Sequence, residues 1–171
     1  MMAWRIAWFK VFKPLAYYAA FFSIRATAFS YETMCMGRER LDYYLAEIRK
    51  KGDEASKKEQ DSIRDMRIVQ EMYARGIEFL PIDLYKAKAN RFQIIDGKLM
   101  PSLSSIDGLG GKAAEAVVEA VKRGERFLSL EDFWQKTKVP KTTIDLMAEL
   151  GIFGDLPRSN QLSLFDLEFT G

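Results

Sequence analysis

Hydrophobic residues recur at helical spacing in the first part of the chain. Leu15, Tyr18 and Phe22 follow Pro14, whose missing N–H suits the first turn of a helix. These residues lie three to four positions apart, which places them on one face of a helix. A helix is therefore predicted over residues 14–24.

Two further stretches combine an apolar stripe with a charged face. Residues 31–51 carry leucine, tyrosine and isoleucine on one face and end in three basic residues before Gly52, which are signals for the end of a helix. Residues 53–75 are heavily charged but keep an apolar stripe, and Gly76 follows where a left-handed cap would fall. Both stretches are predicted to be amphipathic helices.

The hydrophobic period changes near the middle of the chain. Residues 77–81 and 91–100 are short runs rich in β-forming side chains, and Asp96-Gly97 is a strong signal for a tight hairpin turn. Short helical patterns then return, and residues 155–171 end in an apolar cluster that is too short to build a core. We expect a mainly α fold with a small β hairpin and a flexible C-terminal tail.

The aromatic run near the N-terminus is too short to cross a membrane. Lys10, Lys13 and Arg25 leave only residues 14–24 without charge, about half of the roughly 20 apolar residues that a spanning helix needs. We expect a buried helix and no membrane partner. The run begins without a capping residue, which predicts that an upstream part, missing from this chain, covers Trp4, Trp8 and Phe9.

Composition narrows the possible chemistry. Histidine is absent, which removes the commonest general base and metal ligand, and Cys35 is the single cysteine, which argues against a cysteine-based zinc site. The carboxylates of Asp61, Asp65 and Glu71 fall on a charged helix face and are not assigned to Mg²⁺. We expect no catalytic residue, metal or cofactor on this chain, and a reducing cytoplasm fits its cysteine content.

A glycine-rich turn precedes a helix with a small-residue face. The glycines let the chain turn tightly, and the N–H groups at the start of the next helix carry partial positive charge that can hold a phosphate oxygen. Because the net charge is only +2, local donors rather than a global field would carry any DNA binding. The expected DNA-binding residues are Gly108, Leu109, Gly110, Gly111, Lys112 and Ala113.

This turn has two other interpretations. A plain helix–helix turn explains two close glycines, whereas a dinucleotide-binding loop fits poorly because the G-x-G-x-x-G pattern is incomplete. The surrounding pattern consists of Ile106, Gly108, Gly110, Ala113, Val117 and Ala120. This pattern resembles the helix-hairpin-helix motif of many DNA polymerases, ligases and repair nucleases. The resemblance implies a grip on the backbone of duplex DNA that reads no sequence.

A second, degenerate unit follows the first. Ser129 is predicted to cap a helix, with Asp132 completing the capping box, and residues 138–143 lead into another helix. Three lysines here form either a solvated face or additional phosphate contacts, namely Lys136, Lys138 and Lys141.

An apolar box lies in the polar tail. Three large apolar side chains in a short exposed peptide favour burial by a partner, although a terminal strand or helix that packs back onto the protein is the alternative. The sequence QLSLF is similar to the pentapeptide by which bacterial polymerases and repair proteins bind the β sliding clamp. The expected clamp-binding residues are Gln161, Leu162, Ser163, Leu164 and Phe165.

Over its whole length the chain resembles the end of the PolC-type DNA polymerase III alpha subunit of Gram-positive-type bacteria. The likeness is carried by residues 5–10, 14–20, 22–23, 76–81, the glycine hairpin at Gly108 and residues 156–165. It implies the last part of the polymerase fingers over residues 1–76, a tandem helix-hairpin-helix domain over 77–154, and a clamp-binding tail over 155–171.

The resemblance also implies where catalysis lies and which partners to expect. The catalytic aspartates of the family, which bind Mg²⁺, belong to a palm region upstream of this segment, so nucleotide addition is not expected of this chain alone. Expected partners are duplex DNA, the β sliding clamp and the rest of the polymerase alpha subunit, in the bacterial cytoplasm at the replisome. The alternative is a free-standing, clamp-recruited DNA-binding adaptor in repair.

Overall fold

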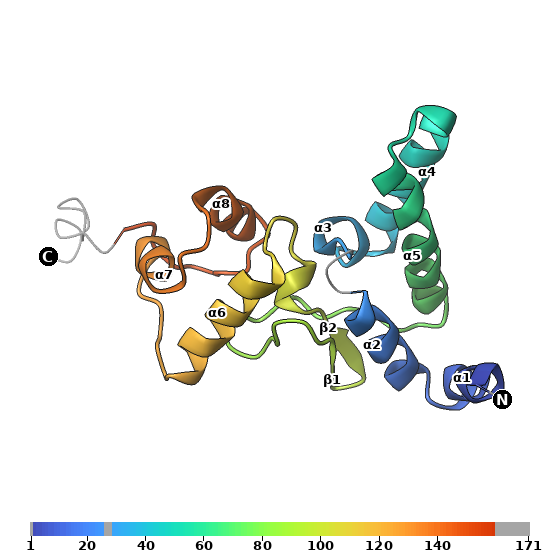
Figure 1. Ribbon diagram of the computed structural model, residues 1–171, viewed down its shortest axis with the longest axis horizontal. Coiled ribbons are helices and arrows are strands. Elements are labelled where there is room, and N and C mark those ends of the chain that lie inside the picture. The colour runs from blue at the N-terminus through green and yellow to red at the C-terminus, as the bar shows by residue number, and fades with distance from the viewer. Residues whose placement is uncertain (1, 26–28, 160–171) are drawn as a thin grey trace, which may run out of the picture.

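The computed structural model describes residues 2–25 and 29–159, and it is mainly helical (Figure 1). The first half contains α1 (Met2–Phe12), α2 (Pro14–Ile24), α3 (Tyr31–Met34), α4 (Arg38–Lys51), a short 3₁₀ helix (Gly52–Glu54) and α5 (Lys57–Ala74). The second half contains β1 (Gln93–Ile95), β2 (Lys98–Met100), a 3₁₀ helix (Leu103–Ser105), α6 (Gly111–Lys122), α7 (Leu130–Thr137) and α8 (Lys141–Glu149). The predicted mainly α fold with a small β hairpin is confirmed.

The helices α4 and α5 lie side by side at one end of the molecule (Figure 1). Ser56 caps α5 in a capping box, because its hydroxyl accepts from the N–H of Glu59 while the Glu59 carboxylate accepts from the N–H of Ser56. Gly76 follows α5 with a φ of +77°, as predicted for a left-handed cap. The apolar faces of the pair bury Leu41, Leu45, Ile48, Met66, Val69 and Met72.

The single helix predicted over residues 31–51 is wrong in one respect. Gly37 adopts a φ of +111°, which breaks the stretch into the short helix α3 and the longer helix α4. Only glycine adopts such a backbone readily, because it has no Cβ atom. The two helices remain in contact through the Arg40–Glu32 ion pair, and Ser30, the N-cap of α3, bonds to Asp107 in the second half of the chain.

A small sheet occupies the middle of the molecule. Strands β1 and β2 are antiparallel, with Ile95 opposite Lys98 across a turn in which Asp96 and Gly97 have φ values of +50° and +75°. Both values are positive, as a two-residue hairpin turn requires, so the predicted turn is confirmed. Phe79 bridges to Leu99 of β2 in parallel, so part of the 77–81 run also joins the sheet.

An aromatic cluster connects α2 with the sheet segments. The ring centroid of Phe22 lies 5.0 Å from Phe29, 5.7 Å from Phe79 and 5.5 Å from Phe92. All three pairs are tilted, and offset aromatic pairs are favourable at these separations. The Ser23 hydroxyl also accepts a 2.9 Å hydrogen bond from the N–H of Phe92, so α2 is fixed to the chain just before β1.

The aromatic run forms two helices, of which α2 buries Tyr18 and Phe22 as predicted. Trp4, Trp8 and Phe9, which were expected to be covered by an upstream part, lie on α1 and are exposed in this chain. Helix α1 buries none of its residues, and Trp4 remains 77% exposed. Polar contacts attach α1 to α5: the Lys10 ammonium lies 2.8 Å from a Glu71 carboxylate oxygen, and the Arg75 guanidinium donates to the Lys10 carbonyl at 3.0 Å. None of the helices in the described residues is both long and apolar enough to span a membrane.

Candidate nucleic-acid interface

The first hairpin connects the 3₁₀ helix Leu103–Ser105 with α6. Gly108 has a φ of +83°, Leu109 is almost fully buried, and Gly110 is the N-cap of α6. Leu109 therefore anchors the turn in the core while Gly108 and Gly110 face solvent. The left-handed conformation explains why a glycine stands at position 108.

The start of α6 presents unused backbone donors. The N–H of Ala114 bonds to the Gly110 carbonyl at 2.9 Å, and within the described residues no acceptor engages the N–H groups of Gly111, Lys112 and Ala113. Gly110 has an ordinary φ of −65°, and no atom lies within 4 Å of a Cβ placed there. The chain does not require glycine at this position for its own conformation, so its effect is to leave the donors open to an approaching group.

The second hairpin repeats the backbone path of the first between α7 and α8. Lys138 has a φ of +57°, Val139 is fully buried, and Pro140 is the N-cap of α8 with φ and ψ of −56° and 140°. The matching N-cap in the first hairpin has φ and ψ of −65° and 161°. The sequences differ, but a left-handed residue, a buried apolar anchor and an extended N-cap follow one another in both hairpins.

The two hairpins lie against each other. The Thr143 hydroxyl, in the first turn of α8, donates to the Gly108 carbonyl at 3.4 Å. A Cβ atom at position 108 would lie 3.2 Å from that hydroxyl oxygen. The N-terminal ends of α6 and α8 therefore belong to one surface.

A side chain from the first half of the chain supports the first hairpin. The Ser30 hydroxyl, which caps α3, donates a 2.6 Å hydrogen bond to the Asp107 carboxylate next to Gly108. The same hydroxyl accepts from the N–H of Thr33. Sequence reasoning missed this contact because 77 positions separate the two residues.

The three lysines of the second unit fall into two groups. Lys136 lies within the protein's own hydrogen-bond network, because its ammonium is 2.9 Å from the Asp132 carboxylate and 3.3 Å from the Arg126 carbonyl. The Leu128 N–H and this ammonium lower the pKa of Asp132. Lys138 and Lys141 instead place their ammonium groups 5.3 Å from the centre of the Trp134 ring.

The expected cap of α7 is present. The Ser129 hydroxyl accepts from the N–H of Asp132 at 3.0 Å, as predicted. The Asp132 carboxylate accepts from the N–H of Leu128, the residue before the N-cap. This cap fixes the end of α7 that lies away from the second hairpin.

The carboxylates of α5 do not form a metal site. Asp65 is buried, not part of the charged face on which it was expected, and its carboxylate lies 2.6 Å from the Arg25 guanidinium. The Glu71 carboxylate accepts hydrogen bonds from the Lys10 ammonium and the Tyr18 hydroxyl. The Lys10 hydrogen bond is the main reason that the pKa of Glu71 is lowered. No group of three or more His, Cys, Asp or Glu side chains in the described residues can hold a metal ion. The residues therefore do not fit Mg²⁺.

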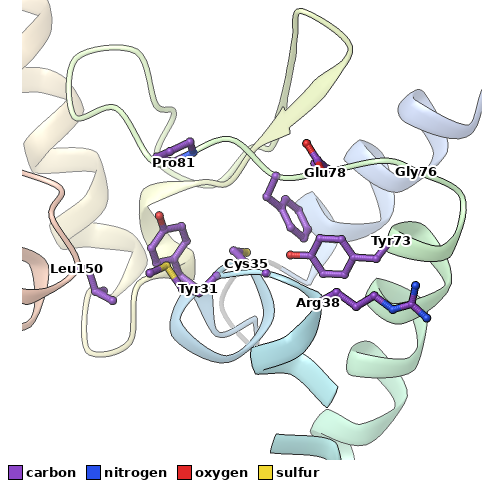
Figure 2. Close-up of a pocket in the computed structure, with 11 residues that line it drawn as sticks. Tyr31, Cys35, Arg38, Tyr73, Gly76, Glu78, Pro81 and Leu150 are labelled. Atoms are coloured by element: carbon purple, nitrogen blue, oxygen red, sulfur yellow. The ribbon is translucent and has the colours of Figure 1, made fainter. Parts of the chain in front are cut away.

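A groove of about 580 Å³ lies between the helices of the first half and the end of α8 (Figure 2). Burial raises the pKa of Tyr31 and of Tyr73, so both phenols stay neutral at physiological pH. Glu78 on its wall lies 3.1 Å from Lys98, and Arg38 lies 3.7 Å from Asp42. The two charged side chains that line the groove, Arg38 and Glu78, therefore already have ion-pair partners.

The predicted clamp-binding residues Gln161, Leu162, Ser163, Leu164 and Phe165 lie outside the described residues. The described chain ends near the start of α7, where the N–H of Leu130 donates to the Pro157 carbonyl at 2.9 Å and the N–H of Glu131 to the Arg158 carbonyl at 3.2 Å. The segment that leads to the pentapeptide is thus fixed to the second unit as far as Arg158.

The paired hairpins define the class of protein. Residues 76–162 match the helix-hairpin-helix motif family, and the chain belongs to this family. The match covers the sheet, both hairpins and helices α6 to α8.

Longer proteins are similar to nearly the whole chain. The DNA polymerase III PolC-type of Caldanaerobacter subterraneus subsp. tengcongensis is 42% identical over 165 residues, which is 96% of this chain. The proteins of the same name from Streptococcus suis and Listeria monocytogenes serovar 1/2a are 46% and 45% identical over 97% and 96% of this chain. The resemblance to PolC-type DNA polymerase III is therefore confirmed. The chain spans 12% of the first relative and 11% of the other two.

Proposed function

We propose that this chain is the non-catalytic, C-terminal DNA-holding part of a replicative DNA polymerase of the PolC type. One observation carries the proposal: two hairpins of the same backbone path lie side by side, and the first leaves the N–H groups of Gly111, Lys112 and Ala113 without an acceptor among the described residues. Groups of this kind bind phosphate oxygens, because the helix dipole adds partial positive charge to the donors.

The proposed partner is the backbone of duplex DNA. The exposed groups of the first hairpin are backbone amides and the Lys112 ammonium, which carries no ion pair among the described residues. Amides and ammonium groups neutralise or hydrogen-bond phosphate but do not distinguish base edges. The mechanism is therefore positional: the hairpins hold the duplex near a catalytic centre that lies elsewhere in the longer protein.

The tail supplies a second proposed contact, to the β sliding clamp. Leu162, Leu164 and Phe165 would enter apolar pockets of the clamp and the Gln161 amide would bond at their rim. Burial of each apolar side chain contributes about 1.5–3 kcal/mol before ordering costs, which corresponds to an affinity on the order of micromolar. Tethering then raises the effective concentration of the hairpins at the DNA.

The rest of the polymerase alpha subunit is the third proposed partner. Helix α1 exposes large apolar side chains on all sides, and exposed apolar surface of this extent is typical of an interface. Residues 1–76 would then end the fingers, 77–154 would form the tandem helix-hairpin-helix domain, and 155–171 the clamp-binding tail. The relatives align with α1 to α5 as well as with the hairpins, which favours a polymerase part over a free-standing repair adaptor.

Binding of labelled duplex DNA tests the hairpin proposal. Gly110→Glu puts a carboxylate in front of the free amides, and we expect it to weaken binding at least about tenfold, since like charges repel across a short distance. Ala46→Glu adds the same charge to the exposed face of α4 and serves as the matched control. Equal weakening by both variants, or no duplex binding by the unchanged chain, would contradict the proposal.

Binding to purified clamp tests the tail proposal separately. The chain is compared with a form that lacks residues 156–171 and with the double variant Leu164→Ala, Phe165→Ala. We expect both changes to abolish micromolar clamp binding, and the double variant to keep its affinity for DNA. Clamp binding that survives the double variant would mean that the tail is not the contact.

A further inference from the structure

The second hairpin differs from the first at the position where a phosphate would approach. Pro140 replaces Gly110 as the N-cap, so this hairpin has one N–H donor fewer and carries a ring where the first has no side chain. The Thr143 N–H is also engaged, by the Pro140 carbonyl at 3.0 Å. A phosphate at the second hairpin therefore finds fewer backbone donors than at the first.

Two ammonium groups lie at this hairpin instead. Lys138 is its left-handed residue and Lys141 is the first residue of α8, and both are exposed. Within the described part of the chain neither takes part in an ion pair, in contrast to Lys136, which pairs with Asp132. Their charge is therefore available to an anion from solvent.

The Trp134 ring holds both lysines. It belongs to the last turns of α7, is 37% exposed, and has the ammonium nitrogens of Lys138 and Lys141 each 5.3 Å from its centre. A cation is attracted to the negative face of an indole, and tryptophan gives the strongest such attraction among aromatic residues. The ring thus restricts two side chains that would otherwise lose much rotamer freedom on binding.

The acidic residues beside this cluster lie away from the hairpin. Glu131 and Asp145 border the same recess of about 290 Å³, together with Arg158. Glu131 lies about one turn before Trp134, toward the start of α7, and Asp145 lies about one turn after Lys141, farther into α8. Arg158 lies beside Glu131, whose N–H donates to the Arg158 carbonyl, and no ion pair joins Lys141 to Asp145 among the described residues, so the Lys141 charge stays unpaired.

We infer that Trp134 is a positioning residue that holds Lys138 and Lys141 over the second hairpin as a phosphate-binding pair. This inference rests on the proposed DNA-binding function and deepens it. The first hairpin would hold a phosphate by backbone amides, and the second by two side-chain charges that replace the donors lost at Pro140. Neither contact reads a base.

The salt dependence of duplex binding tests the lysine pair in the full chain. The variant Lys138→Asn, Lys141→Gln removes both charges, and asparagine tolerates the left-handed backbone at position 138. The slope of log K against log salt concentration should fall in magnitude by about 1.8, or 0.9 for each lost phosphate contact. Lys122→Gln, Arg123→Gln, which removes two charges at the far end of α6, is the matched control and should leave the slope unchanged.

A double-mutant cycle tests the role of Trp134. Trp134→Leu keeps the net charge, and we expect it to weaken duplex binding about two- to fivefold, the size of an exposed cation–π contact, while Trp134→Phe restores most of the affinity. In the Lys138→Asn, Lys141→Gln background Trp134→Leu should have no further effect. Thermal unfolding of each variant establishes that the fold is retained.

The outcomes separate this inference from the proposed function. If Gly110→Glu weakens binding but the double lysine variant keeps the salt slope, only the phosphate pair is refuted. If Trp134→Leu weakens binding equally with and without the lysines, the indole acts in another way, such as by stacking on a base, and the positioning role is refuted. If the unchanged chain binds no duplex, both fail together.

Discussion

Lys138 occupies, in the second hairpin, the backbone position that Gly108 occupies in the first: φ is +57° at Lys138 and +83° at Gly108. A residue with a Cβ atom is strained in this region, whereas glycine is not. The strain is retained at a residue whose ammonium lies over Trp134 beside the proposed phosphate site. At this position glycine is therefore expected to favour stability, and lysine to favour DNA binding.

Lys138→Gly should make the protein more stable and weaken its DNA binding. Relief of the left-handed strain should raise the free energy of unfolding by about 0.5–1 kcal/mol, after the entropy of the unfolded glycine is counted. Urea unfolding measures this change. Gln135→Gly is the control, because Gln135 is a solvent-exposed residue within α7. It should lower the same free energy by up to about 1 kcal/mol.

Alanine at the two glycines of the first hairpin should separate folding from binding. Gly108→Ala should lower the free energy of unfolding by about 1–2 kcal/mol, because φ is positive and the new methyl group would lie 3.2 Å from the Thr143 hydroxyl. Gly110→Ala should leave stability within about 0.5 kcal/mol, because its φ is ordinary and its surroundings are open. Only the second variant should lose DNA affinity without losing stability, as measured by duplex titration beside thermal unfolding.

Asp132→Asn should cost stability in a pH-dependent manner. The Leu128 N–H and the Lys136 ammonium stabilise the carboxylate, so its pKa in the folded protein lies below its ordinary value of 3.8. The contribution is complete above that value and is lost as the pH falls through the lower, folded pKa. We expect the variant to be less stable by about 1 kcal/mol at pH 7. Urea unfolding between pH 7 and pH 2.5 should show the two proteins converging only at the acid end; a constant difference would contradict the assignment.

The buried Asp65 should matter far more to stability than its exposed neighbour Asp61. Asp65→Ala removes a buried carboxylate that lies 2.6 Å from the Arg25 guanidinium and should cost about 1–3 kcal/mol, since the remaining guanidinium is partly solvated. Asp61→Ala removes an exposed carboxylate from the same helix and should change stability by less than about 0.5 kcal/mol. Chemical unfolding of both variants under the same conditions measures the two changes in the free energy of unfolding.

Features that depend on local sequence were predictable. Pro14 and the apolar repeat placed α2 at its observed bounds, and Asp96-Gly97 marked the hairpin turn that the structure contains. The glycine pattern likewise indicated the first hairpin, because a positive φ at Gly108 is a property of a few consecutive residues. Periodicity and turn chemistry act over short distances, so a single sequence reveals them.

Features that depend on contacts between distant residues were not predictable. The hydrogen bond from Ser30 to Asp107 and the ion pair of Arg25 with Asp65 each join residues that no spacing rule relates. The break at Gly37 was missed because one glycine within a helical pattern costs only about 1 kcal/mol and does not by itself end a helix. The recruitment of Lys138 and Lys141 by Trp134 depends on how α7 packs against α8, which the lysines themselves do not reveal.

Helix α1 is attached at the periphery, so the interactions that hold it are largely distinct from those that stabilise the hairpins. Because α1 buries no side chain, its position depends on α2 and on the polar contacts of Glu71 and Arg75 with Lys10. Its displacement would disrupt few interactions in the core that holds Leu109 and Val139. Movement at this end of the molecule would therefore be only weakly coupled, in thermodynamic terms, to the geometry of the hairpins. A surface that packs on α1 could reorient it while the spacing of the two hairpins stays the same.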